Sequence, residues 1–269
     1  MTELQDRLFF SSNSIGATDN SSAGFRFGAV GTHSSRTLML SELSIILDLL
    51  PLGFTRENCR RAIIDENCLG KPTTATRKLS FQRLTELYGL NQEIPLFRLL
   101  DRLWRLTPDA RPQLALLIAL ARDPLLRSTS LAIAATPYGA DFPRQAVAEA
   151  LRTLTAGRLN ESILDKVVRN CASSWTQSGY FEGRTFKRRT RVRPSYASVA
   201  LALALSRLAG FRGAALFSSS WTSLLDTDPT MARELAMEAK RNGLIDLRIS
   251  GDVVDMDLTR LDPVFVQIA

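Results

Sequence analysis

The chain has 269 residues, of which 45% are hydrophobic and 23% charged, and 34 Lys and Arg against 27 Asp and Glu give a formal net charge of +7. This composition is typical of a globular protein, and the length allows two small domains or one large one. No apolar run reaches the roughly 18 to 20 residues of a membrane span, and the opening MTELQDRLFF is unlike a signal peptide. We therefore expect a cytoplasmic protein without membrane contact.

Residues 1–36 differ in composition from the rest of the chain. Ser, Gly, Asn and Thr dominate residues 11–35. The sequence GFRFGAVG within them lacks the lysine and hydroxyl residue of a phosphate-binding P-loop. We expect residues 1–36 to form a flexible N-terminal arm, with an irregular extension that includes a short strand at residues 25–30 as the alternative.

The scarcity of metal-binding and nucleophilic residue types limits the possible chemistry. Cys59, Cys68 and Cys171 are scattered and form no CxxC pair, and His33 is the only histidine. A zinc site lacks ligands, and Ser-His-Asp or Cys-His catalysis would have to use His33, within the arm expected to be mobile. The sequence therefore predicts buried, inert thiols, no metal, no cofactor and no enzymatic activity.

Residues 37–125 predict a helical domain. Apolar residues recur there at helical spacing in five segments, and Thr55 and either Thr73 or Thr74 stand where N-caps are expected. The last of the five segments is apolar nearly all round, which predicts burial at the centre of the domain. The predicted helices cover residues 41–50, 56–66, 74–88, 94–104 and 111–122.

Basic residues crowd the start of the third of these helices. They are Lys71, Arg77 and Lys78, with Arg83 one turn further on. Positive charge near a helix N-terminus opposes the macrodipole, so a bound anion would relieve a repulsion. A second, weaker phosphate contact and an ordinary solvated face both remain open here.

The same region carries a sequence pattern that resembles a known family. The pattern comprises DLL-x-x-G at residues 48–53, R-x-A-I at 60–63, ENCL at 66–69, and the lysine at 71 leading into TRK at 76–78. It resembles the start of the BrxA-like proteins, small and mainly helical accessory proteins of BREX phage-defence systems. The resemblance implies a NusB-like helical core for residues 37–125, DNA binding, and partners among other defence-system proteins.

Residues 126–194 predict a winged-helix-like unit. Two helices, at residues 125–136 and 144–156 with the turn PYGADFP between them, precede a third at residues 162–178. Gly179 stands where that helix should end. Aromatic and polar residues then alternate around Gly183, as in a β-ribbon with a tight bend.

Most of the excess positive charge lies in this unit. Residues 162–193 contain eight Lys and Arg against two acidic residues, a local net charge of +6. Such a concentration is the footprint of a phosphate-binding surface. A solvated loop, or a tract that meets an acidic protein, would have the same composition. The expected DNA contacts are Lys166 and Arg169 on the helix and Arg184, Lys187, Arg188, Arg189, Arg191 and Arg193 in the ribbon.

Residues 195–269 predict a C-terminal helical unit with a second hairpin. Helical patterns cover residues 196–208, 216–225 and 230–241, and alternating segments flank a Gly-Asp turn at residues 251–252. This ribbon carries Asp246, Asp252, Asp255 and Asp257 against Arg248. Phosphate would repel it, so we expect packing or protein contacts, and the aspartates form either a solvent face or, alternatively, a metal site.

The sequence thus predicts a mainly α protein with winged-helix-like units, whose function is non-catalytic binding of duplex DNA in a BREX-like defence system. Two alternatives stay open. The basic ribbon could dock on an acidic partner in a multi-protein complex, or the helical core could bind RNA.

Overall fold

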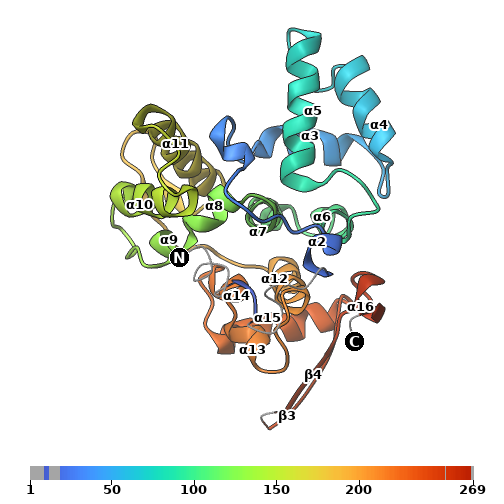
Figure 1. Ribbon diagram of the computed structural model, residues 1–269. Helices are drawn as coiled ribbons and strands as arrows, with labels where there is room; N and C mark the ends of the chain where they lie inside the picture. The colour runs from blue at the N-terminus through green and yellow to red at the C-terminus, as the bar shows by residue number, and fades with distance from the viewer. Residues whose placement is uncertain (1–8, 12–18, 252, 268–269) are drawn as a thin grey trace.

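The structure is a computed structural model that describes residues 9–11, 19–251 and 253–267. It is 58% helical, with 15 α-helices and two two-stranded antiparallel sheets among the described residues. The expected mainly helical fold is therefore confirmed (Figure 1). Within the described ranges, no helix has both the length and the apolar character to cross a bilayer.

The first helices follow the sequence prediction closely. Thr55 and Thr73 accept hydrogen bonds from the backbone of Asn58 and Thr76, so each caps its helix as expected. The second predicted helix continues from its α-helical start into a π-helical turn. The elements are α2 (Asp19–Ala23), the 3-10 turn η1 (Thr32–Ser34), α3 (Leu40–Leu49), α4 (Arg56–Arg60), the π-turn η2 (Arg61–Asp65), α5 (Thr74–Tyr88), α6 (Pro95–Trp104), η3 (Pro108–Ala110) and α7 (Arg111–Arg122).

The middle of the chain contains four helices followed by a short hairpin. The segment predicted as one helix at residues 125–136 is broken at Thr129, because the Thr129 hydroxyl bonds to the Leu126 carbonyl and accepts a hydrogen bond from the Trp175 indole. The elements are α8 (Pro124–Ser128), α9 (Ser130–Ala134), α10 (Arg144–Thr155), α11 (Glu161–Gln177), β1 (Phe181–Glu182) and β2 (Arg188–Arg189).

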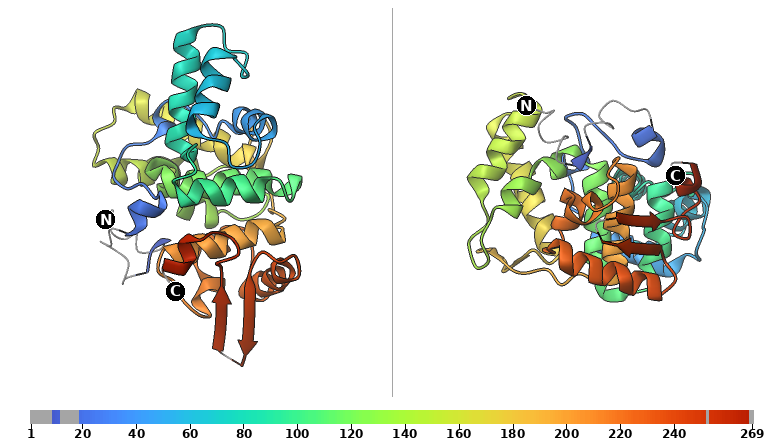
Figure 2. Two further views of the ribbon diagram at one scale, coloured as in Figure 1. Left: turned by 90° about the vertical axis from the view of Figure 1, so that its right-hand side faces the viewer. Right: turned by 90° about the horizontal axis from the view of Figure 1, so that it is seen from below.

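The C-terminal part ends in a longer hairpin that projects from the body of the molecule (Figure 2). Asp228 caps the long helix before it by accepting from the Met231 N–H. The predicted second hairpin is present, although Asp252 in its turn lies outside the described residues. The elements are α12 (Tyr196–Leu208), α13 (Ala215–Ser218), α14 (Ser220–Ser223), α15 (Pro229–Arg241), β3 (Asp246–Ser250), β4 (Val253–Asp257) and α16 (Val264–Gln267).

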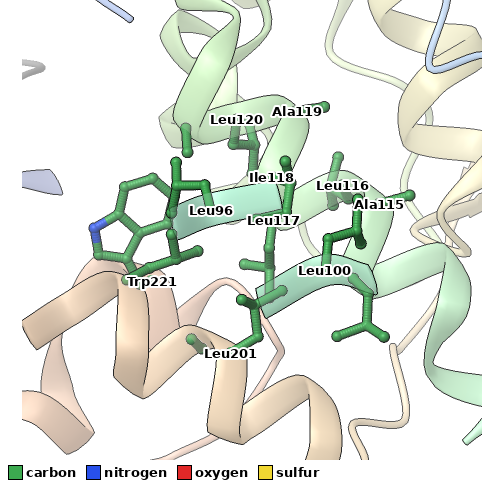
Figure 3. Packing of buried hydrophobic residues seen from close by; sticks show 14 of the residues in the cluster. Leu96, Leu100, Ala115, Leu116, Leu117, Ile118, Ala119, Leu120, Leu201 and Trp221 are labelled. Atoms are coloured by element: carbon green, nitrogen blue, oxygen red, sulfur yellow. The ribbon is translucent and has the colours of Figure 1, made fainter. Parts of the chain in front are cut away.

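Helix α7 lies at the centre of the molecule, as its apolar pattern predicts. Its Leu114 to Ala121 side chains are fully buried, and it packs against α5, α6, α8 and α12. Figure 3 shows Leu117 and Ile118 of α7 among residues from α6 and from the C-terminal helices, including Leu201 and Trp221. One continuous hydrophobic core therefore connects the three regions that the sequence suggests as separate units.

The N-terminal segment corrects one expectation. Residues 19–36 were expected to belong to a flexible arm, but Phe25 and His33 are buried within the core. Phe9 also packs edge-on against Trp221, with ring centroids 4.8 Å apart. Composition alone missed this, since the apolar partners lie far away in sequence. Residues 1–8 and 12–18 of the expected arm lie outside the described residues.

Candidate nucleic-acid interface

The short hairpin is fixed to the helices before it by a third extended segment. β1 pairs with one edge of β2, and Asp141, in the loop before α10, forms a bridge with Arg188 on the other edge. Backbone hydrogen bonds from Gly139 N to Arg189 O and from Phe142 N to Lys187 O, of 2.8 and 2.9 Å, continue this pairing. β2 is thus the central strand of a small sheet that joins the α9–α10 loop to the segment after α11.

The bend between β1 and β2 requires a glycine. Gly183 has φ +99°, and a Cβ atom on it would lie 2.0 Å from the carbonyl oxygen of Phe186. Any larger residue would force the bend open. The close approach holds residues 183–187 as a compact tip, called the wing below, from which Arg184 and Phe186 point into solvent.

Helix α11 presents a polar face beside the wing. Asn160 caps the helix by accepting from the Ile163 N–H. Its apolar face, which includes Val167 and Trp175, is buried against the core, as the 3.6-residue period predicts. Lys166 and Arg169 lie on the exposed side.

A groove of about 510 Å³ lies between α11, the wing and the start of α10. We call it the cationic groove. Four of its side chains are basic, and only one is acidic. The residues that line it are Asp141, Phe142, Arg144, Arg169, Ala172, Arg184, Thr185, Phe186 and Lys187.

The charges around the cationic groove are only partly neutralised. Asp165 on α11 pairs with both Arg144 and Arg169, the latter at 3.2 Å between Nε and Oδ2. Within the residues that the structure describes, Lys166, Arg184, Lys187 and Arg188 have no ion-pair partner. The groove therefore keeps a net positive charge able to attract an anionic ligand.

Arg189 does not belong to this surface, contrary to the sequence prediction. Its side chain is 3% exposed, and Nη2 lies 2.5 Å from Oδ1 of Asp226. Its guanidinium also lies over the Tyr180 ring, 4.9 Å from the centroid. Because successive residues of a strand point to opposite faces, Arg188 faces solvent while Arg189 faces the core.

Arg191 and Arg193 are exposed, but they line a different groove. It lies between residues 191–194 and α15, and Glu234 and Glu238 on α15 contribute opposite charge to it. The structure thus separates these two arginines from the cationic groove, although all were expected in one basic ribbon.

The expected second phosphate contact on α5 is reduced to one residue. Lys71 pairs with Glu42 at 2.9 Å, and Arg77 donates to the carbonyl oxygens of Lys71 and Ile64. Lys71 therefore ties the segment before α5 to α3, and Arg77 ties α5 to that segment and to η2. Lys78 is exposed, but Figure 1 shows α5 in a different part of the molecule from α11.

Two residues of the groove were missed by sequence reasoning. Arg144 begins α10, and Asp141 pairs with β2 as a third extended segment of the sheet. The sequence PYGADFP, which contains Asp141 and directly precedes Arg144, predicts only a turn. A single bridged residue is shorter than any alternating pattern that sequence can reveal. The proline at position 143 was the available signal for Arg144, because a helix that begins directly after it has Arg144 as its first residue.

His33 takes part in a buried polar network that has the composition of a catalytic triad. Its Nδ1 lies 2.9 Å from Asp123 Oδ2, and its Nε2 lies 2.8 Å from Ser174 Oγ. All three residues are at most 1% exposed, so a substrate has no access to the Ser174 hydroxyl. Gly31 permits this arrangement, since a Cβ there would lie 2.1 Å from Asp123 Oδ1. We assign the network to holding residues 31–34 against α8 and α11.

The remaining candidate chemistry receives no support. Cys59 and Cys171 are buried, and burial raises the pKa of the Cys59 thiol to about 12. No group of three or more metal-ligating side chains occurs within the described ranges. On the projecting hairpin, Asp246 pairs with Arg260 at 2.8 Å, which fits a solvated surface.

Comparison with known proteins adds no assignment. No family model matches the chain, and no curated protein matches its sequence. The likeness to the BrxA-like proteins therefore rests on the sequence pattern, whose quoted motifs lie within residues 48–78. In the structure these residues connect α3, α4 and α5, and Ala62 and Ile63 among them are buried.

Proposed function

We propose that this protein binds duplex DNA through a winged helix made of residues 124–189. The observation that carries the proposal is the chain order. Helix α8–α9, the extended residue Asp141, helices α10 and α11, strand β1, the wing and strand β2 follow one another, with β2 between β1 and Asp141 in the sheet. Winged-helix DNA-binding proteins have this order of elements. The positive charge of the cationic groove supports the same proposal.

In the proposed complex α11 enters the major groove, which is wide enough for a helix. Ser162, Lys166, Arg169 and Ser173 lie at spacings of three and four along its outer side, so they would face the base edges. Arg144, Arg184, Lys187 and Arg188 would contact phosphates on either side. Arg189 positions β2 and makes no DNA contact.

The proposal predicts salt-sensitive binding. Four to six phosphate contacts would give a slope of about −4 to −5 in a plot of log affinity against log salt. Fluorescence anisotropy with a labelled duplex of about 30 base pairs, at about 50 and 200 mM salt, measures this slope. Changing Arg184 and Lys187 to Ala should lower the affinity and reduce the slope by about 2.

Arg248 provides a matched control, because it is an exposed arginine on the other hairpin. The variant Arg248→Ala should bind DNA like the wild type. If the folded wild type does not bind duplex DNA at either salt concentration, the proposal is wrong and the groove faces an acidic protein instead. If single-stranded RNA displaces the duplex at lower concentration than unlabelled duplex does, the ligand is RNA.

We further propose that the protein is a BrxA-like accessory factor of a BREX-like defence system. The support is the pattern at residues 48–78 together with a helical fold that contains a cationic groove. The genes beside the coding sequence test this proposal. A neighbourhood without other phage-defence genes would contradict it, and DNA binding would remain a separate question.

A further inference from the structure

Phe186 stands out among the aromatic residues of the wing region. Its side chain is 78% exposed, the highest value among the large hydrophobic residues that the structure describes as exposed. Phe181 and Phe142 in the same small sheet instead pack against each other, with ring centroids 5.2 Å apart. Phe142 and Phe181 therefore contribute to the packing of the sheet, whereas the Phe186 ring is exposed to solvent.

The wing holds Phe186 in a defined place. The Gly183 approach to the Phe186 carbonyl fixes the bend, and the Lys187 ammonium donates to the Gly183 carbonyl at 3.4 Å. Arg184 and Lys187 flank the ring in sequence, and neither has an ion-pair partner among the described residues. A projecting ring between two cations on a short, constrained turn loses little conformational freedom on binding.

We propose that Phe186 is a wedge that enters the minor groove and inserts between two base pairs, bending the duplex. This inference rests on the DNA-binding function proposed above and specifies the form of DNA. Apolar side chains on minor-groove proteins unstack base steps in this way. Arg184 and Lys187 would reach the phosphates on the two sides of the groove.

The wedge gives the protein a preference for deformable DNA. Pyrimidine–purine steps such as TA are easily unstacked, whereas A-tracts are stiff. The insertion cost is therefore lowest where a TA step lies beneath the wing. Selectivity of this kind arises from DNA shape and needs no hydrogen bond to a base edge.

The test compares two labelled duplexes that differ only in a central TA step or a central A-tract. Energy transfer between dyes at the two ends reports bending, and titration reports affinity. The wild type should bend the TA duplex and bind it more tightly. Phe186→Ala should abolish the bend and lower the affinity for the TA duplex about tenfold, because an apolar side chain no longer becomes buried, while the salt slope stays unchanged.

Two further variants keep the test specific. Phe186→Leu should retain much of the bend, because an aliphatic side chain also acts as a wedge. Val253→Ala, at the exposed tip of the other hairpin, should behave like the wild type. Since Phe186 and Val253 are both exposed, none of the three changes should affect folding.

Distinct results separate the two proposals. If the wild type binds both duplexes with the expected salt slope but leaves them unbent, or if Phe186→Ala bends the TA duplex as the wild type does, the wedge is wrong and DNA binding stands. If the wild type binds neither duplex, both proposals are wrong. Loss of binding to anionic phosphatidylserine vesicles in Phe186→Ala, with DNA affinity unchanged, would assign the ring to a lipid surface and overturn the wedge.

Discussion

Arg188 and Arg189 show how neighbouring residues of one type take opposite roles. Arg188 faces solvent beside the cationic groove. Arg189 is buried, where it forms an ion pair with Asp226 and lies over the Tyr180 ring. Asp226 also accepts from the Val192 N–H at 2.8 Å, so one carboxylate holds both β2 and the segment after it. Charge composition cannot distinguish the two arginines, because the difference depends on which face of β2 meets the core.

This difference predicts unequal effects on stability. Arg189→Met should lower the free energy of unfolding by about 3 kcal/mol, because the Asp226 carboxylate would stay buried without its partner. Arg188→Met should change it by less than about 0.5 kcal/mol, as expected for an exposed site. Urea unfolding followed by circular dichroism measures both values, and equal values would contradict the assignment of Arg189 to the core.

The His33 network predicts a dependence of stability on pH. Burial opposes ionisation of Asp123, but the charge of His33 and hydrogen bonds from His33 and Leu126 outweigh it and lower the Asp123 pKa below its ordinary 3.8. A lowered folded-state pKa stabilises the protein above the unfolded-state pKa, and this contribution is lost as the pH falls through the folded-state value.

The variant Asp123→Asn tests this dependence. At pH 7 it should be less stable than the wild type by about 2 to 3 kcal/mol. The difference should narrow as the pH falls below about 3.8, because the Asp123 carboxylate is then protonated first in the unfolded state and, at still lower pH, in the folded state. Urea titrations at a series of pH values measure the difference, and a constant gap down to strongly acidic pH would exclude an ionised Asp123.

At the scale of elements, the sequence predicts most helices to within a few residues. Periodicity locates α3, α5, α6, α7, α10, α11, α12 and α15, since each of these helices has a buried face. All of them except α3 also have a polar cap or a proline at their start. The predicted helix at residues 216–225 is broken at Ser219, whose hydroxyl bonds to the Thr222 backbone N–H. Such local side-chain bonds interrupt a helix without changing its apolar pattern.

Most of the candidate site, in contrast, depends on tertiary pairing. The sequence identifies α11, the bend at Gly183 and the basic tract, because each has a local pattern. It cannot show that Asp141 pairs with β2, or that Arg191 and Arg193 turn toward α15. These placements follow from contacts between segments up to about 50 residues apart, which no local pattern encodes.

The wing allows a prediction with an internal control. Gly179 and Gly183 both have positive φ, at +86° and +99°, but only Gly183 lies against backbone atoms. Gly179→Ala should lower the free energy of unfolding by about 1 kcal/mol, because an L-residue is strained at positive φ. Gly183→Ala should lower the free energy of unfolding by more than this and should displace the wing, because its Cβ would overlap the Phe186 carbonyl.

Two measurements separate these glycines. Urea unfolding gives the stability costs, and amide chemical shifts of residues 184–187 report the position of the wing. Gly183→Ala should shift these amides and lower DNA affinity, whereas Gly179→Ala should do neither. Equal stability costs and unchanged amide shifts in both variants would mean that the bend at Gly183 is not sterically constrained.

At the scale of the whole molecule, one hydrophobic core joins all parts. It includes Phe97 of α6, Trp175 of α11 and Trp221 of α14. Arg98 on α6 also makes two hydrogen bonds of 2.7 Å to Asp262, a nearly buried residue close to α16. These contacts tie the C-terminal part to the first helices, so the structure does not divide into independently packed units.

A shared core predicts cooperative unfolding. Tryptophan fluorescence, from Trp104, Trp175 and Trp221, and far-ultraviolet circular dichroism should give the same urea midpoint. Arg98→Ala should lower both midpoints together, because Asp262 would stay buried without a partner. A transition that appears in one signal only would show that part of the chain unfolds separately.

The packing of Phe9 and Phe10 has a consequence for synthesis on the ribosome. The Phe9 carbonyl accepts a hydrogen bond from the indole of Trp221, and the Ser11 N–H donates to Ala209. At about 5 to 20 residues per second, roughly 10 to 40 seconds separate translation of the two partners. During that interval the Phe9 and Phe10 rings lack their final environment, so this segment cannot take up its native packing until almost the whole chain has been made.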